Sequence, residues 1–209
     1  MLWDKKYIFV FVIIILHVVG VIGISIESTK NLVLSLSFIN LTIGFLLLVF
    51  SVNNEKKGLL IFLAIAFIIG YLSELIGVHS GLLFGDYWYG KNLGPKIAEV
   101  PVIIGINWGI LAITSAAITE LYKFNKWSKV FLNSLLMVLF DFVMEPVAMK
   151  SDFWSWKDDV VPIYNYFCWF IIAFIIQVIY LNLFNIKLNI VFRALFIIQF
   201  VFFLILYLL

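Results

Sequence analysis

Long apolar stretches alternate with short polar segments along the whole chain, and this pattern predicts transmembrane helices. An apolar span needs about 20 residues to cross a hydrocarbon core of about 30 Å. Seven stretches approach or reach that length, at residues 7–26, 32–52, 59–78, 100–121, 128–148, 163–184 and 190–209. We therefore expect an all-α bundle of about seven transmembrane helices.

Three prolines refine the expected helix ends. Pro101 and Pro162 lie where the fourth and sixth helices should begin, and a proline is tolerated there because its missing N–H has no helical partner to lose. Pro146 lies inside the fifth span and should kink or end that helix.

The composition agrees with a membrane protein. The chain is 65% hydrophobic and 12% charged, with a mean hydropathy of +1.15, whereas soluble domains are roughly 45–50% apolar and about 25% charged. We expect one transmembrane domain over residues 1–209, in the cytoplasmic (inner) cell membrane. The first span follows Lys5 and Lys6 but lacks a small-residue cleavage site, so it is expected to stay as a helix rather than to be a signal peptide.

The basic residues predict the orientation of the bundle, because cytoplasmic connections carry the excess of Lys and Arg. Nine of the 14 basic residues fall on the side of the N-terminus and five on the other side. We therefore expect a cytoplasmic N-terminus and an outer C-terminus. The two long loops, 80–99 and 149–162, then share the outer side, and loops of that length in a compact bundle are usually functional.

Several function classes are excluded by what the chain lacks. A net charge of +2 without a basic block gives no surface for nucleic acid. The single Cys168 excludes an internal disulfide and a Cys-rich metal site, and His17 and His79 alone cannot form a His-based metal centre. There is no dinucleotide fingerprint and no phosphate-binding loop, and the last span has no lysine for a retinal Schiff base.

Three carboxyl groups lie inside predicted spans, namely Glu74, Asp141 and Glu145. An ionisable group in mid-membrane costs about 2.5–3.5 kcal/mol on insertion scales, so such groups indicate a functional site by default. Apart from Lys129 at the very start of the fifth span, the only basic residues within spans are His17 and Arg193, too few to pair with three acids. Asp141 and Glu145 are four residues apart on one helix face, and we expect at least one acid to hold a proton near neutral pH.

Polar and aromatic side chains on two other helices are expected at the same depth. Counting from the outer ends of the fourth and sixth spans reaches Asn107 and Trp108, and then Asn165 and Trp169. An indole face can line an apolar ligand or stabilise a cation. The loop aromatics at 87–89 and 154–156 are equally well read as interfacial anchors or as ligand contacts, and His79 fits an interfacial hydrogen-bonding residue better than a catalyst.

Half of the chain resembles a known family. The segments that carry the resemblance are GYLSELIGVHSGLLFGDYWYG (70–90), GPKIAEVPVIIGINW (94–108), DFVMEPVA (141–148), FWSW (153–156) and VPIYNYFCW (161–169). Together they resemble the membrane-bound carotenoid hydratases of bacteria and haloarchaea. The resemblance implies addition of water to the terminal C=C of an acyclic carotenoid end group, of the lycopene, γ-carotene or bisanhydrobacterioruberin type, to give a tertiary alcohol.

The resemblance and the acid cluster together suggest a role for each candidate. Asp141 or Glu145 would protonate the alkene, Glu74 would position or deprotonate the water, and Trp108 or Trp169 would face the cation. The candidate substrate-binding residues are Trp108, Asn107, Trp169, Asn165, Tyr87, His79 and Trp154. No cofactor or metal is expected. The expected partners are a hydrophobic carotenoid and lipid, with association with other carotenoid enzymes as a further expectation.

Three other readings stay open at this stage. Asp141 and Glu145 resemble one carboxylate pair of a Mg²⁺–diphosphate site, which would suit a prenyltransferase, although that chemistry generally needs more oxygen ligands and bases. A carotene end-group cyclase uses the same protonation but loses a proton instead of capturing water. A non-enzymatic protein, either a proton-coupled transporter or a lipid-binding scaffold, could also use buried acids, although no inverted repeat is visible.

Overall fold

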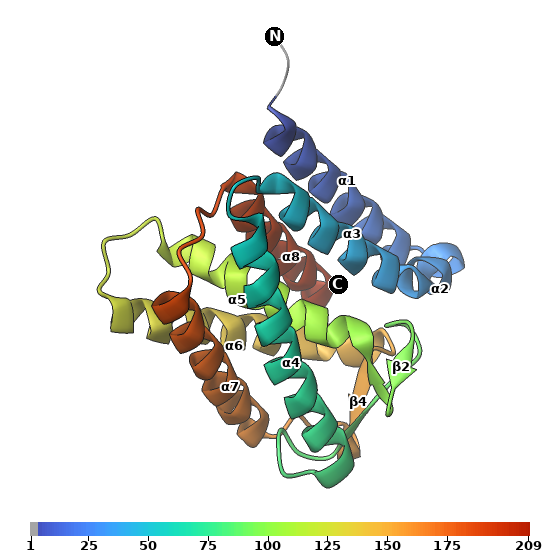
Figure 1. Cartoon of the computed structure of the whole chain (residues 1–209). Coiled ribbons are helices and arrows are strands. Elements are labelled where there is room, and N and C mark those ends of the chain that lie inside the picture. The colour runs from blue at the N-terminus through green and yellow to red at the C-terminus, as the bar shows by residue number, and fades with distance from the viewer. Residues whose placement is uncertain (1–3) are drawn as a thin grey trace.

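The computed structural model describes residues 4–209, and helices dominate it (Figure 1). The α-helices are α1 (Lys5–Ser25), α2 (Glu27–Ser35), α3 (Ser37–Ser51), α4 (Lys56–Ser80), α5 (Val102–Thr119), α6 (Lys126–Lys150), α7 (Ile163–Leu183) and α8 (Ile190–Leu208). The short elements between them are the strands β1 (Tyr87–Tyr89), β2 (Lys96–Ile97), β3 (Val100–Pro101) and β4 (Trp154–Trp156), and the 3₁₀ helix η1 (Lys157–Asp159).

The helices have the length and apolarity of membrane spans. Six of those in the described chain, α1 and α4 to α8, are long and apolar enough to cross a membrane by themselves. Helices α2 and α3 meet the same condition as a pair. The prediction of an all-α membrane bundle with about seven spans is confirmed, and the protein is a multi-pass membrane protein.

Two details differ from the sequence prediction. The second span is not one helix over 32–52, because α2 and α3 meet at a bend of 53°. The helix already begins at Glu27, and the break falls at Leu36, where Ser35 Oγ donates to Leu32 O at 2.7 Å. Helix α6 does not end at Pro146, since it continues to Lys150.

Helix α5 is the centre of the bundle. In its membrane-length window 78% of the residues are buried, compared with 11% in α1. Helix α4 packs along α5, α7 along α6, and α8 along α1 (Figure 1). Small residues allow the closest approach, because a Cβ on Gly105 of α5 would lie 2.6 Å from Phe67 Cδ2 on α4.

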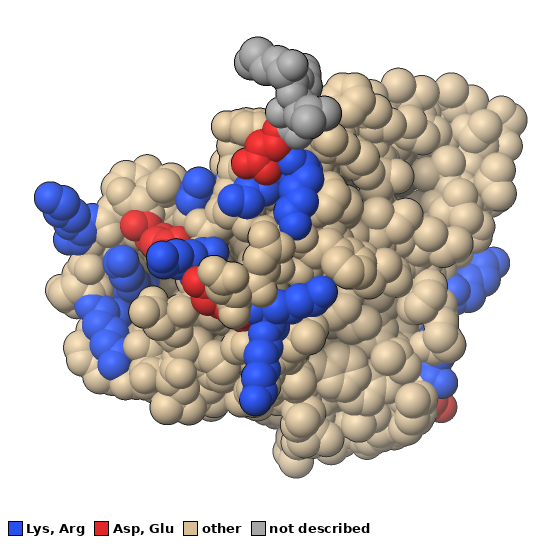
Figure 2. Space-filling model, turned by 45° about the horizontal axis from the view of Figure 1, so that its top comes forward, with Lys and Arg blue, Asp and Glu red and all other residues tan. Residues whose placement is uncertain are grey.

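The end of the bundle where α1 begins carries most of the basic side chains (Figure 2). The chain is tied together there, since Lys5 Nζ donates to Asn53 Oδ1 at 3.1 Å and Asn189 Nδ2 donates to Ser51 O at 3.1 Å. The α3–α4 and α7–α8 connections therefore share this end with the start of α1. That this end is the cytoplasmic one stays a prediction.

The two long loops meet at the opposite end. Strand β1, from the first loop, pairs antiparallel with β4, from the second, with Tyr87 opposite Trp156 and Tyr89 opposite Trp154. The glycine after β1 is needed for this contact, because a Cβ on Gly90 would lie 2.1 Å from the backbone oxygen of Asp152. The pairing places a small aromatic sheet over the ends of α4 to α7.

Candidate active site

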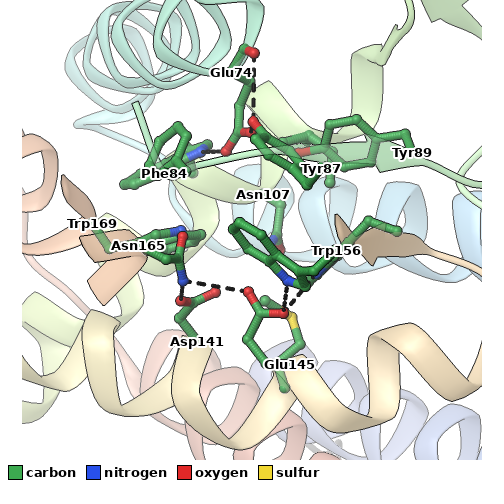
Figure 3. A pocket seen from close by; sticks show the side chains of 14 residues that line it. Glu74, Phe84, Tyr87, Tyr89, Asn107, Asp141, Glu145, Trp156, Asn165 and Trp169 are labelled. Carbon is green, nitrogen blue, oxygen red and sulfur yellow. Dashed lines mark hydrogen bonds between the residues drawn. The ribbon is translucent and has the colours of Figure 1, made fainter. Parts of the chain in front are cut away.

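A small buried cavity lies beneath the β1–β4 sheet, between α4, α5, α6 and α7 (Figure 3). Its volume is about 30 Å³, which is room for one or two water molecules. The lining residues are Glu74, Phe84, Tyr87, Tyr89, Ile104, Asn107, Trp108, Asp141, Met144, Glu145, Trp154, Trp156, Asn165 and Trp169. Apolar rings and three acids therefore share one enclosed space.

The β1–β4 sheet supplies hydrogen-bond donors to the cavity because side chains alternate along a strand. Tyr87 and Tyr89 are buried while Trp88 between them is exposed. Trp154 and Trp156 are likewise both buried on β4. Each strand thus directs two aromatic side chains with N–H or O–H groups toward the carboxyl groups below.

Glu74, on α4, is surrounded by donors. Its Oε2 accepts from Tyr87 Oη at 2.6 Å and Tyr89 Oη at 2.7 Å, and its Oε1 accepts from Trp108 Nε1 at 2.9 Å. Three donors leave one of the roughly four lone-pair sites of a carboxylate free. The side chain is 3% exposed, so this donor set replaces the hydration that burial removes.

The two tyrosines stay neutral donors over a wide pH range. Burial raises the pKa of both the Tyr87 and the Tyr89 phenol, and the adjacent Glu74 carboxylate raises each pKa further. Both residues lie on β1, outside the membrane-length helices. A neutral phenol can donate to Glu74, whereas a phenolate could not.

Glu145, on α6, is held by the other strand. Its Oε2 accepts from Trp154 Nε1 at 2.8 Å and Trp156 Nε1 at 2.7 Å, and its Oε1 lies 3.4 Å from Asn165 Nδ2. The residue is 2% exposed. Like Glu74, it is a buried carboxyl group with several neutral donors and no cation beside it within the described chain.

Asp141 differs from the other two acids. Its Oδ2 accepts one hydrogen bond, from Asn165 Nδ2 at 2.9 Å, while its Oδ1 is buried and has no hydrogen-bond partner among residues 4–209. The side chain is fully buried. In Figure 3 the carboxyl groups of Asp141 and Glu145 turn toward each other on α6, and Glu74 faces them from the opposite side of the cavity.

Two indole rings form one wall of the cavity. Trp108 of α5 and Trp169 of α7 stack with ring centroids 4.0 Å apart and planes 21° from parallel. Gly70 on α4 makes this possible, because a Cβ there would lie 2.3 Å from Trp108 Cγ. The stacked rings offer a π face beside the acids.

The structure brings nine of the ten candidate residues together around this cavity. His79 is the exception: it lies at the exposed end of α4, and its Nε2 is 3.0 Å from Ala98 O. Phe84, Ile104 and Met144 also line the cavity and were not predicted, and Tyr89 and Trp156, which the sequence left open between interfacial anchors and ligand contacts, line it too. The alternation in YWY and WSW was the available signal for the paired strands, and hence for Tyr89 and Trp156.

The cavity has no basic lining residue, because neither Lys nor Arg is among its lining side chains in residues 4–209. The same part of the chain has no group of three or more His, Cys, Asp or Glu side chains placed to hold a metal ion. A diphosphate would therefore meet carboxyl groups here without a cationic side chain to offset its charge.

Comparison with known proteins places the chain in a family. The family model described as "Carotenoid biosynthesis protein" matches residues 31–208, which is most of the chain. The chain belongs to the carotenoid biosynthesis protein family. Every lining residue of the cavity falls inside the matched region. The protein thus has a role in carotenoid biosynthesis.

One relative has a stated activity, and its sequence similarity to this chain is low. A bisanhydrobacterioruberin hydratase from Haloarcula japonica is 26% identical over 129 residues, covering 58% of this chain and 43% of the relative. The chain therefore spans less than half the length of that relative. No solved structure matches this carotenoid biosynthesis protein.

Proposed function

We propose that this carotenoid biosynthesis protein is a hydratase that adds water to the terminal C=C of an acyclic carotenoid end group, giving a tertiary alcohol. The observation that carries the proposal is the free, buried Oδ1 of Asp141 beside a cavity whose other two acids are supplied with donors. The name of the Haloarcula japonica relative points to the same reaction type.

The proton donor in this proposal is Asp141. Two adjacent buried carboxyl groups do not both carry charge easily, and Asp141 receives one hydrogen bond whereas Glu145 has three neighbouring donors. One of the two carboxyl groups therefore holds a proton, and we place that proton on Asp141 Oδ1. A neutral carboxylic acid in a site with little water is a suitable acid for an unactivated alkene.

The proposed reaction neither consumes nor releases a proton overall. The π electrons of the alkene take the Asp141 proton at the carbon with fewer substituents, and a tertiary cation forms at the carbon with two methyl groups. Glu145 and the stacked Trp108 and Trp169 rings supply negative charge and π density beside it. The oxygen of a water molecule bonds to the cation, and the proton it loses returns to Asp141.

Glu74 is proposed to hold the attacking water. Its three donors occupy all but about one of its lone-pair sites, and that site accepts a water O–H. The cavity volume of about 30 Å³ has room for the water but not for the water and the alkene together. Binding of the carotenoid end therefore requires the apolar lining, such as Met144 and Ile104, to move apart.

Expression in a host that makes lycopene tests the proposal. The expected product is a pigment heavier by one water. Asp141→Asn should lower its rate of formation by about 100-fold or more, and Glu74→Gln and Glu145→Gln should also lower it. Glu120→Gln is the matched control, since this carboxyl group is exposed at the other end of α5 and should leave the rate unchanged.

The rival functions give different results in the same host. A cyclase would yield a pigment of unchanged mass, and a prenyltransferase would consume a prenyl diphosphate with Mg²⁺. Unchanged pigment together with pH-driven solute uptake would point to a transporter. Full activity in all three acid variants would remove the assigned site.

A further inference from the structure

A second cavity lies on the other side of α6 from the site described above. It is lined by α1, α3, α8, the end of α6 and the loop residues Leu93 and Phe153, and its volume is about 60 Å³, which is room for about two to four water molecules. Val147 of α6 and Ser151, which follows α6, line it, whereas Asp141 and Glu145 of α6 line the first cavity. The two cavities share none of their lining residues.

Two amide groups line this second cavity with oxygens that have no partner. Gln199 Oε1 on α8 and Asn40 Oδ1 on α3 are buried and accept no hydrogen bond from residues 4–209. Gln199 is 5% exposed. A buried carbonyl oxygen without a donor is costly, so both oxygens point to a ligand that carries an O–H group.

An apolar groove of about 280 Å³ adjoins the cavity, on the face of α1 and α8 that is exposed at the surface of the bundle. His17 and Phe202 line both spaces, and their rings pack edge to face with centroids 5.3 Å apart. The other groove residues are aliphatic side chains of the two helices. A molecule from the lipid could lie along this groove and reach the amides past Phe202.

We propose that the groove and the second cavity form a binding site for a hydroxyl-terminated isoprenoid, with the chain in the α1–α8 groove and the hydroxyl group on Gln199 and Asn40. The groove accommodates an apolar chain, the cavity has room only for the end of a molecule, and the two free oxygens require a donor there. Membership of the carotenoid biosynthesis family favours an isoprenoid over other long-chain alcohols.

Photo-crosslinking of the full chain in lipid nanodiscs tests this site. The probe is an isoprenoid alcohol with a diazirine next to its hydroxyl group, and its methyl ether is the comparison because it lacks the O–H donor. The alcohol should label cavity residues such as Phe202 about fivefold more than the ether does, the effect of one hydrogen bond. Labelling needs no turnover, so the same result is expected in Asp141→Asn, and failure of the proposed hydration would not alter it.

A matched pair of variants on α8 completes the test. Gln199→Met should reduce labelling by the alcohol to the level of the ether, while Leu204→Met, at a partly exposed position outside both spaces, should not. Without ligand, Gln199→Met should unfold at the same or a higher temperature, because it removes an unsatisfied amide. Equal labelling by alcohol and ether would mean that the groove holds only lipid tails, and no labelling in the cavity would mean that it holds only water. Either result overturns the proposal.

Discussion

Trp108 and Trp169 stack at 4.0 Å between ring centroids, and the same Trp108 indole donates through Nε1 to Glu74 at 2.9 Å. The Trp108 side chain therefore links the stacked indole wall of the cavity to the Glu74 carboxyl group on α4. The geometry of Glu74 depends on the packing of Trp108 between α4 and α7. Because Trp108 donates to Glu74 and Trp169 does not, replacing each tryptophan by phenylalanine should have different effects.

We predict that Trp108→Phe lowers the rate of the proposed hydration more than Trp169→Phe does. Trp108→Phe removes a buried donor to a carboxyl group, which should cost about 10–100-fold. Trp169 donates no hydrogen bond within the described chain, so Trp169→Phe weakens only the stack and should cost less than about tenfold. Initial rates of pigment hydration in isolated membranes measure both, normalised to inserted protein. Equal losses would contradict a separate role for the Trp108 N–H.

A second prediction concerns the space that the glycines leave for Trp108. Gly70→Ala should lower the rate by about 100-fold, because a Cβ 2.3 Å from Trp108 Cγ must displace that ring from Glu74. Gly58→Ala on the same helix is the control, since the nearest atom to its Cβ would be 4.0 Å away. Parallel assays of rate and thermal unfolding measure both variants. A Gly70→Ala protein with parental activity would show that the position of Trp108 is not needed.

The helices could be predicted from the sequence because the membrane forces each span to satisfy its own backbone hydrogen bonds. A long apolar run therefore has few alternatives to a helix, and the predicted ends of α7 and α8 lie within one residue of those observed. The bend between α2 and α3 could not be found this way, since apolarity runs on through Leu34 and Leu36 while the break depends on local Ser35 and Leu36 geometry.

The acids of the site could also be predicted, because a carboxyl group inside an apolar span is conspicuous at any depth. Their partners could not. Trp154 and Trp156 contact Glu145 only because β4 pairs with a strand from another loop, and a pairing between two loops of this length leaves no periodicity beyond three residues. The free oxygen of Asp141 likewise depends on where Asn165 sits, which is a tertiary contact.

A third prediction concerns alkaline pH. Burial raises the pKa of Tyr89 above the usual value of 10.0, so above pH 10 the unfolded chain loses this proton while the folded chain keeps it. Ionisation of Tyr89 therefore leaves the free energy of unfolding unchanged below about pH 10. Above that pH the free energy of unfolding falls by about 1.4 kcal/mol per pH unit for each such tyrosine. Tyr89→Phe should remove one such contribution and make the decline shallower. Chemical unfolding in detergent between neutral pH and pH 11 measures the slope, and identical slopes for parent and variant would contradict the assignment.

The last prediction separates stability from catalysis. A buried polar chain in the other half of the bundle runs from Asn133 Nδ2, which donates to Gln177 Oε1 at 2.9 Å, to Gln177 Nε2, which donates to Ala112 O at 2.8 Å. It joins α6, α7 and α5 but includes no residue that lines the first cavity. Gln177→Leu should therefore destabilise the protein by about 0.6–2 kcal/mol and leave the hydration rate per folded molecule unchanged. Ile175→Leu, at a lipid-exposed position on the same helix, should change neither. If Gln177→Leu abolished hydration while the protein stayed folded, the polar chain would have to be part of the reaction, and the cavity beneath β1 and β4 would not be the whole site.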